Sequence, residues 1–224
     1  MLVAGDIIKK CSITLKDPDN VRWLQDELLG YLDEAQREIS RVPGAYTKIV
    51  LHELSEGTKQ QLPAEAVKLL SVLRNWNDDD EPCDPVVITT RSLLDAFDPD
   101  WHTCPRRQFV DNYIYDDRSP DVFFVYPPND GTGRVELMYA ANPEKLSSVN
   151  DVLVLRDEFE TPLVMYVLYR AYNKDSYYSA GLQMATSFYT AYTSSLQSAM
   201  QSAGTTTPNA ALVAGAVKPN GGTE

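Results

Sequence analysis

The stretch YVLYRAYNKDSYYSAGLQMATSFYTAY, residues 166–192, contains seven tyrosines. Its apolar and aromatic residues recur every three to four positions on both sides of NKDS, which is typical of two helices separated by a break. A buried tyrosine brings a hydroxyl group that needs a hydrogen-bond partner, so it suits a boundary between apolar and polar surroundings. We interpret six of these residues as part of a helix-bundle core or a subunit interface: Tyr166, Tyr169, Tyr172, Tyr178, Tyr189 and Tyr192.

Helical periodicity extends to both sides of the NKDS break. A helix is predicted from 158 to about 172, opened by a capping box between Asp157 and Glu160. It is apolar nearly all round, so we expect it to be buried on more than one side. A second helix is predicted from about 176 to 203. Its residues at heptad-like spacing are expected to form one buried seam: Tyr178, Leu182, Ala185, Tyr189, Tyr192, Leu196 and Met200.

The N-terminal end of the chain also has helical spacing. Apolar residues recur at this spacing over 3–15, and a continuous apolar stripe runs along 24–42 opposite a strongly acidic face. Each apolar stripe needs a facing helix. We therefore expect the helices at the two ends of the chain to form one four-helix bundle.

The middle of the chain changes to the pattern of strands. Strands are predicted over 47–54, 60–62, 71–76, 85–89, 112–116, 122–127 and 134–140. The last three are separated by residues that favour turns, so they are expected to form an antiparallel meander. AEAVKLL (64–70) is interpreted as one or two helical turns, and RSLLDAF (91–97) as a helix.

The C-terminal segment 204–224 has no amphipathic period and is rich in Gly, Thr and Pro. We interpret it as an extended docking arm that a partner would hold, with Pro208, Leu212, Val213 and Val217 as its contact residues.

The predicted fold class is therefore α+β, with three parts. Residues 1–44 and 156–203 form the four-helix bundle, residues 45–155 form an inserted antiparallel β domain, and residues 204–224 form the extended arm.

Composition restricts the classes of function. The net charge of −12 argues against a broad nucleic-acid surface, which needs clustered Lys and Arg. The acidic run NWNDDDEPCD (75–84) is interpreted as a solvated loop. No apolar run is long enough to cross a membrane, and the N-terminus does not have the pattern of a signal peptide. Three cysteines without framework spacing fit reduced thiols in a cytoplasm.

The sequence offers no chemistry that would indicate an enzyme. His52 and His102 lie far apart, and Cys83 and Cys104 lack the spacing of a zinc site. No phosphate-binding, nucleophile-elbow or metalloprotease motif is present. We therefore predict no catalytic residues, no metal and no cofactor.

Seven segments, taken together and in order, resemble one protein family. They are VRWLQDELLGYLDEAQREI (21–39), AYTKIVLHELSEGTKQQLP (45–63), LLSVLRNW (69–76), DPDWH (98–102), YIYDDRSPDVFFVYPP (113–128), VELMYAANP (135–143) and YVLYRAYNKDSYYS (166–179). The arrangement resembles the adaptor, or head-to-tail connector, proteins of tailed bacteriophages, akin to the tail tubular protein A type. The likeness covers about residues 2–200 and leaves the C-terminal arm outside it.

The resemblance implies a structural virion protein rather than an enzyme. Proteins of this kind form rings, usually of twelve subunits, that dock beneath the portal protein and carry the downstream tail or nozzle proteins. Genome DNA would pass through the ring without specific binding, and an acidic inner wall would repel its phosphates. The implied location is the neck of the virion, assembled in the cytoplasm of the bacterial host.

Two other interpretations remain open at this point. One is another ring protein of the tail, such as a tail terminator or a nozzle component. The other is an acidic binding protein without enzymatic activity, which would be a monomer or dimer rather than a ring.

Overall fold

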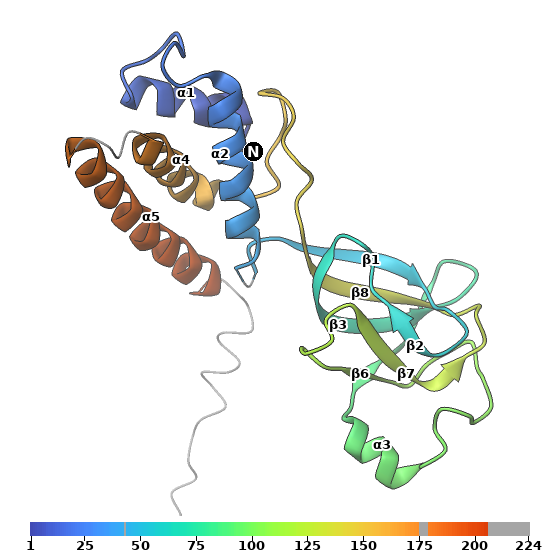
Figure 1. Ribbon diagram of the computed structural model, residues 1–224. Coiled ribbons are helices and arrows are strands. Elements are labelled where there is room, and N and C mark those ends of the chain that lie inside the picture. Colours follow the sequence, from blue (N-terminus) through green and yellow to red (C-terminus); the bar gives the residue numbers. More distant parts are fainter. Residues whose placement is uncertain (43, 175–178, 206–224) are drawn as a thin grey trace, which may run out of the picture. The chain divides into compact units, whose positions relative to one another are not determined.

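The computed structural model describes the backbone of residues 1–42, 44–174 and 179–205. Within these ranges it contains five α-helices and two four-stranded sheets, which confirms the α+β class (Figure 1). The chain divides into two compact units. Met1–Ile39 and the described chain after Pro143 form the helical unit, and Ser40–Pro143 form the β unit.

Four helices belong to the helical unit, although α2 ends one residue beyond its boundary. They are α1 (Ala4–Thr14), α2 (Gln25–Ser40), α4 (Glu160–Lys174) and α5 (Ser179–Thr205), and the short 3-10 turn η1 (Asp157–Phe159) precedes α4. The connection from α1 to α2 is organised by Asp17, whose carboxylate accepts hydrogen bonds from the backbone N–H groups of residues 21–23. These hydrogen bonds lower the pKa of Asp17, and the bond from the N–H group of Trp23 has the largest effect.

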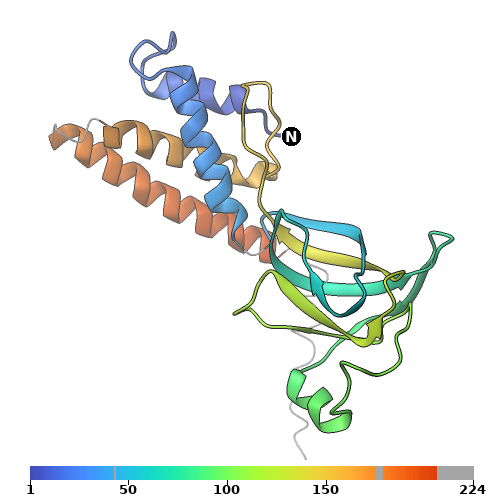
Figure 2. The same ribbon diagram turned by 45° about the vertical axis from the view of Figure 1, so that its right-hand side comes forward.

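The core of the helical unit draws buried side chains from all four helices. Fully buried examples are Ile7 and Cys11 of α1, Leu28, Leu32, Ala35 and Ile39 of α2, and Leu163, Val167 and Ala171 of α4. Helix α4 packs along α5 and also against α1 (Figure 2). The indole of Trp23, which precedes α2, donates to the backbone carbonyl of Ala171 in α4 at 3.1 Å, and Glu34 of α2 pairs with Arg170 of α4. The predicted four-helix bundle is thus supported in part.

Three of the seven positions predicted for the seam along α5 are wrong. Leu182, Tyr189 and Met200 are 53, 47 and 40 % exposed, whereas Ala185 and Tyr192 are buried and Leu196 is half-buried; Tyr178 lies outside the described residues. Ala199, which the predicted seam did not include, is buried as well. The predicted seam combined residues of two neighbouring stripes of α5: a buried stripe with Ala185 and Tyr192, and an exposed stripe with Leu182, Tyr189 and Met200. The packed stripe is the one with the small residues, because alanine lets two helix backbones approach closely.

The predicted capping box at the start of α4 is not formed. The carboxylate of Asp157 pairs with the N-terminal amino group at 2.9 Å, and that of Glu160 pairs with Lys10 of α1. The turn η1 precedes α4 and has no side-chain cap. Tertiary ion pairs therefore use both carboxylates that the local pattern assigned to capping.

The β unit consists of two sheets. The first has the order β1–β8–β3–β4 and the second β2–β7–β6–β5. The strands are β1 (Thr47–Glu53), β2 (Gly57–Gln61), β3 (Ala66–Trp76), β4 (Pro82–Pro85), β5 (Val87–Ile88), β6 (Asn112–Tyr115), β7 (Val122–Asn129) and β8 (Arg134–Ala141). Residues 66–76 form one strand, so the helical turns predicted within 64–70 are wrong.

The predicted meander is also wrong. Strands β6 and β7 pair antiparallel, but β8 leaves that sheet and pairs with β1 and β3 in the other. Alternate side chains of β8 are buried, from Val135 to Ala141, in one core with residues of both sheets. Burying this apolar face between two layers decides the partner of β8. Strand β5 pairs parallel with β6, so the β unit is not purely antiparallel.

A smaller core covers the other face of the second sheet. Helix α3 (Arg91–Phe97) begins at Thr90, whose hydroxyl accepts from the N–H of Leu93. Its buried Leu94 packs with Trp101 and with Ile114 of β6. This packing holds the start of α3 beside the edge of the sheet.

Candidate subunit interface

Four of the predicted tyrosines come together between α4 and α5, and we call them the tyrosine cluster: Tyr166, Tyr169, Tyr189 and Tyr192. The ring centroids of Tyr166 and Tyr192 are 5.3 Å apart in an edge-to-face arrangement. Those of Tyr169 and Tyr189 are 5.1 Å apart and tilted. Both separations lie in the favourable range for aromatic pairs, so the cluster ties the two helices together.

The hydroxyl groups of the two buried tyrosines, Tyr166 and Tyr192, each have a partner, one of them on α2. The hydroxyl of Tyr192 donates to Glu38 at 3.0 Å, and that of Tyr166 accepts from Arg170 at 3.3 Å. Arg170 also pairs with Glu34 and lies 5.0 Å from the ring centre of Tyr31. The tyrosines of α4 and α5 can therefore be buried without an unsatisfied hydroxyl.

The acids of this network belong to the acidic face that the sequence pattern places opposite the apolar stripe of 24–42. Glu27, Glu34 and Glu38 do lie on the acidic face of α2, but each has a partner on α4 or α5: Lys174, Arg170 and Tyr192 respectively. The sequence carried one usable signal, since these acids recur at helical spacing of seven and four residues.

Burial perturbs the titration of the tyrosines in this network. It raises the pKa of Tyr166 and of Tyr192 above the usual value. For Tyr31, burial and then the hydrogen bond to Glu27 raise the pKa to about 12. The neutral phenol is thus favoured in the folded protein.

This shift predicts a loss of stability at alkaline pH. Because the pKa of Tyr31 is higher in the folded than in the unfolded chain, its stabilisation is complete below about pH 10 and disappears as the pH rises through about 12. Between these values we expect wild type to lose more unfolding free energy than Tyr31→Phe. Urea unfolding across this pH range measures the difference, and equal losses in the two proteins would contradict the prediction.

The other predicted residues lie outside the cluster. Tyr172 stacks on Phe188 with ring centroids 5.4 Å apart, and it contacts Trp23. Tyr178 and the four arm residues Pro208, Leu212, Val213 and Val217 lie outside the described residues.

One flank of α5 is exposed and carries no charge. Its residues are Leu182, Thr186, Tyr189, Thr193 and Met200, and we call them the α5 flank. Residues 179–205 include no Asp, Glu, Lys or Arg at all, in a chain of net charge −12. A shallow groove of about 730 Å³ runs over Leu182, Thr186 and Thr190. A long charge-free helix with exposed Leu, Tyr and Met side chains is typical of a surface that contacts another protein.

Metal-binding geometry is not found in the parts of the chain that the structure describes. No three His, Cys, Asp or Glu side chains gather there as metal ligands would. His102 hydrogen-bonds with Thr58 and stacks on Trp101, while the ring of His52 lies beside Phe123. Nor does any described helix have the length and hydropathy needed to cross a membrane.

The comparisons with known proteins give one informative result. No curated protein matches the sequence. A family model described as SU10 adaptor protein matches residues 4–213, which is nearly the whole chain and includes both units. The chain therefore belongs to the SU10 adaptor protein family, and this membership implies a structural role as a phage head-to-tail adaptor.

Proposed function

We propose that this protein forms a ring beneath the portal protein of a tailed phage, joins the DNA-filled head to the tail, and continues the DNA channel. Membership in an adaptor family indicates a structural protein that binds neighbouring virion proteins, not an enzyme. The proposal adds the finer points: a ring of twelve copies, the portal above it, and downstream tail or nozzle proteins below. The kinship with tail tubular protein A belongs to this proposal too.

The observation that best supports ring formation is the charge-free α5 flank. Copies of a chain with net charge −12 repel one another, most of all where charges face each other. Two copies approach at the lowest electrostatic cost through a surface without charge. The exposed Leu182, Tyr189 and Met200 supply apolar area for such a contact. The tyrosine cluster then serves both the packing of α4 on α5 and the contact between subunits.

The same charge explains why the ring would close only in the virion. Free subunits are expected to be monomers or small oligomers, because a complete ring concentrates the negative charge of every copy. Contact with the portal supplies the additional binding free energy. Acidic side chains facing the channel would keep the passing DNA from adhering.

We assign the parts of the chain accordingly. Residues 1–44 and 156–203 are proposed as a four-helix bundle that makes the ring contacts, and residues 45–155 as an inserted β domain. Residues 204–224, with Pro208, Leu212, Val213 and Val217, are proposed as an arm that docks on the portal or on a neighbouring adaptor. Fully extended, such an arm would reach about 70 Å.

A reconstitution assay tests the function. Purified protein is added to heads that contain the portal but lack the adaptor, and its occupancy is measured by cryo-electron microscopy. Wild type is expected to form a ring at the portal. Leu182→Asp/Tyr189→Asp is expected to leave the subunit folded but to reduce occupancy at least tenfold, because it places charge on the α5 flank. Truncation after residue 204 is expected to weaken attachment without lowering the melting temperature.

The control places the same charge elsewhere on the helical unit. Ile13→Asp/Leu24→Asp also replaces two exposed apolar residues, and it should retain wild-type occupancy. If wild type never joins the portal, the proposed function is wrong. If the α5-flank variant joins as well as the control does, the ring contact lies elsewhere.

A further inference from the structure

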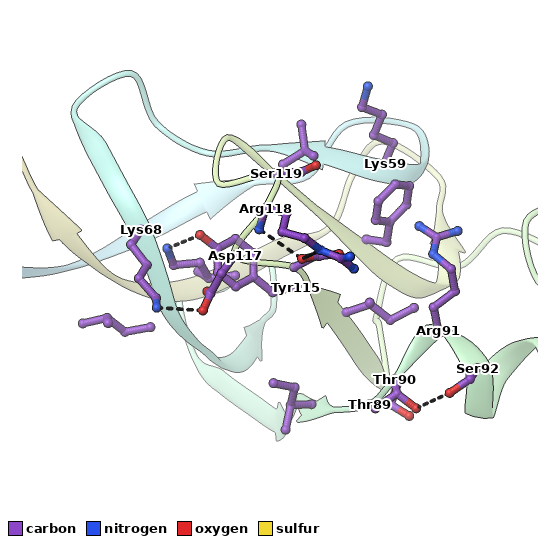
Figure 3. A pocket seen from close by; sticks show the side chains of 17 residues that line it. Lys59, Lys68, Thr89, Thr90, Arg91, Ser92, Tyr115, Asp117, Arg118 and Ser119 are labelled. Atoms are coloured by element: carbon purple, nitrogen blue, oxygen red, sulfur yellow. Dashed lines mark hydrogen bonds and ion pairs between the residues drawn. The ribbon is translucent and has the colours of Figure 1, made fainter.

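A groove of about 1200 Å³ lies on the β unit, at the end where β6 turns into β7 (Figure 3). Strands β2, β3, β5, β6 and β7, the β6–β7 turn and the start of α3 contribute its walls. Lys59 and Arg91 project at one end of it, Lys68 lies at the other, and Arg118 stands between them (Figure 3). Four cations in one groove contrast with the acidic charge of the whole chain.

Two of the four cations are committed to carboxylates of the groove itself. Lys68 pairs with Asp117 at 3.0 Å, and Arg118 pairs with Asp116 at 2.7 Å. Hydrogen bonds from Arg118 lower the pKa of Asp116 to about 2, so this carboxylate stays ionised.

Lys59 and Arg91 are the two cations left over. Within the described residues neither forms an ion pair with a carboxylate, and both side chains are exposed. Arg91 lies instead over the ring of Phe124, 4.6 Å from its centre. Together they leave a net charge of two positive units, four cations against two carboxylates, to face a bound partner.

The groove also offers exposed apolar side chains and an open strand edge. Leu70 of β3 and Ile88 of β5 are exposed to solvent on its wall. Strand β5 is the edge strand of its sheet, so one side of its backbone has no neighbouring strand in that sheet. Such an edge can accept main-chain hydrogen bonds from an extended segment. The groove thus suits an acidic segment of polypeptide with some apolar surface.

The same unit presents a segment of this kind at its opposite end. The turn between β3 and β4, residues 77–81, carries three aspartates and a glutamate, all exposed. Asp80 pairs with Arg134 at 2.8 Å, so the turn and this arginine together carry a net charge of three negative units. The side-chain oxygen of Asn77 accepts from the N–H groups of Asp79 and Glu81 at 3.1 and 2.8 Å, which fixes the shape of the turn. A preformed turn loses little conformational freedom on binding.

Strand β3 connects the basic groove to the acidic turn. It passes from Lys68, which lines the groove, to Trp76, which precedes the turn. At about 3.3 Å per residue this separates the two features by ~25 Å. Figures 1 and 2 also show the β3–β4 and β6–β7 turns at opposite ends of the β unit. Opposite charges at opposite ends allow a head-to-tail contact, which generates a ring when the rotation closes.

We propose that the groove of one copy binds the acidic turn 77–81 of the next copy. Lys59 and Arg91 face the aspartates, and Leu70 and Ile88 contact apolar residues that flank the turn, such as the exposed Pro82. This inference rests on the proposed ring, because the ring supplies the next copy. It adds a second, charge-paired contact in the β unit to the one through the α5 flank.

DNA fits the groove less well than the acidic turn does. A duplex presents a dense row of phosphates, and binding it requires many cations along the backbone. The groove has two uncommitted cations and two carboxylates that would repel phosphate. A short acidic turn matches this limited charge.

The test uses a labelled peptide of residues 74–85 with Cys83→Ser, and its binding is followed by fluorescence anisotropy at low ionic strength. Wild-type protein is expected to bind it, and added salt should weaken binding. Lys59→Glu/Arg91→Glu should bind at least tenfold more weakly. The matched control Lys9→Glu/Lys145→Glu makes the same change of net charge on the helical unit and should bind as wild type does. A peptide with Asp78→Asn, Asp79→Asn, Asp80→Asn and Glu81→Gln should lose binding to unaltered protein, whatever the folding of the variants.

The outcomes test the proposed groove contact and the proposed adaptor function independently of each other. Equal peptide binding by wild type and the groove variant overturns the proposal, as does binding of the neutralised peptide. Groove-dependent binding of a short DNA duplex in place of the peptide overturns it too. In the reconstitution assay with portal-containing heads, wild-type occupancy by Lys59→Glu/Arg91→Glu would refute the groove contact between subunits. The adaptor function would not be affected by this result. Failure of wild type to join refutes the function, while the peptide result still decides whether the groove recognises the turn.

Discussion

Leu28→Ala is expected to lower the free energy of unfolding of the helical unit by about 2–5 kcal/mol. Leu28 is 0 % exposed and begins the buried stripe of α2, with Leu32 and Ala35 on the same face. Truncation removes its apolar area from the core and leaves a cavity that packed neighbours cannot fill. Urea unfolding followed by circular dichroism at the helical band reports on this unit.

The control is Leu24, which precedes α2 and lies outside its buried stripe, although the sequence pattern included it. Leu24 is 61 % exposed, so Leu24→Ala is expected to change the unfolding free energy by less than about 0.5 kcal/mol. A loss below about 1 kcal/mol for Leu28→Ala would place Leu28 outside a packed core and contradict the bundle of α2 with the other helices.

Asn129→Ala is expected to destabilise the β unit by at least about 2 kcal/mol. The side chain of Asn129 is fully buried at the end of β7. Its amide group donates to the carbonyls of Arg107 and Gln108 at 3.1 and 2.7 Å, and its oxygen accepts from the N–H groups of Gly131 and Gly133 at 2.8 and 3.2 Å. Alanine removes all four bonds and leaves buried backbone groups without partners.

Asn129 matters because it stands where the chain passes from one sheet to the other. Gly131 has φ of 92°, which suits glycine, and a Cβ at Gly133 would collide with the side chain of Asn129. Asn112→Ala is the matched control. The side chain of Asn112 donates one hydrogen bond, to the carbonyl of Val87, and this bond lies near the surface. Asn112→Ala should cost less than about 1 kcal/mol. Thermal unfolding followed by tryptophan fluorescence compares the two variants. Similar melting temperatures would show that the hydrogen bonds of Asn129 do not stabilise the connection from β7 to β8.

Local sequence patterns were enough to predict the type of most helices and strands. Apolar residues at helical spacing placed helices within two to three residues of α1, α2, α4 and α5, and RSLLDAF matches α3. The strands β1, β6, β7 and β8 were also placed closely. These patterns are local, because a helix or strand that covers a core must repeat its apolar residues at its own period. The ordered motifs likewise pointed to a phage adaptor, which the family match supports.

The packing partner of each helix and strand, in contrast, depends on contacts between residues far apart in the sequence. Along α5, the sequence could not separate the buried stripe of Ala185 and Tyr192 from the exposed α5 flank, because both stripes are apolar and the choice depends on the position of α4. The sheet that β8 joins depends on strands far away in the sequence, β1 and β3. The groove collects Lys59, Arg91 and Arg118 from three separate elements. Period is a property of neighbouring residues, whereas pairing and clustering depend on contacts between distant ones, so a single sequence does not encode them in any local pattern.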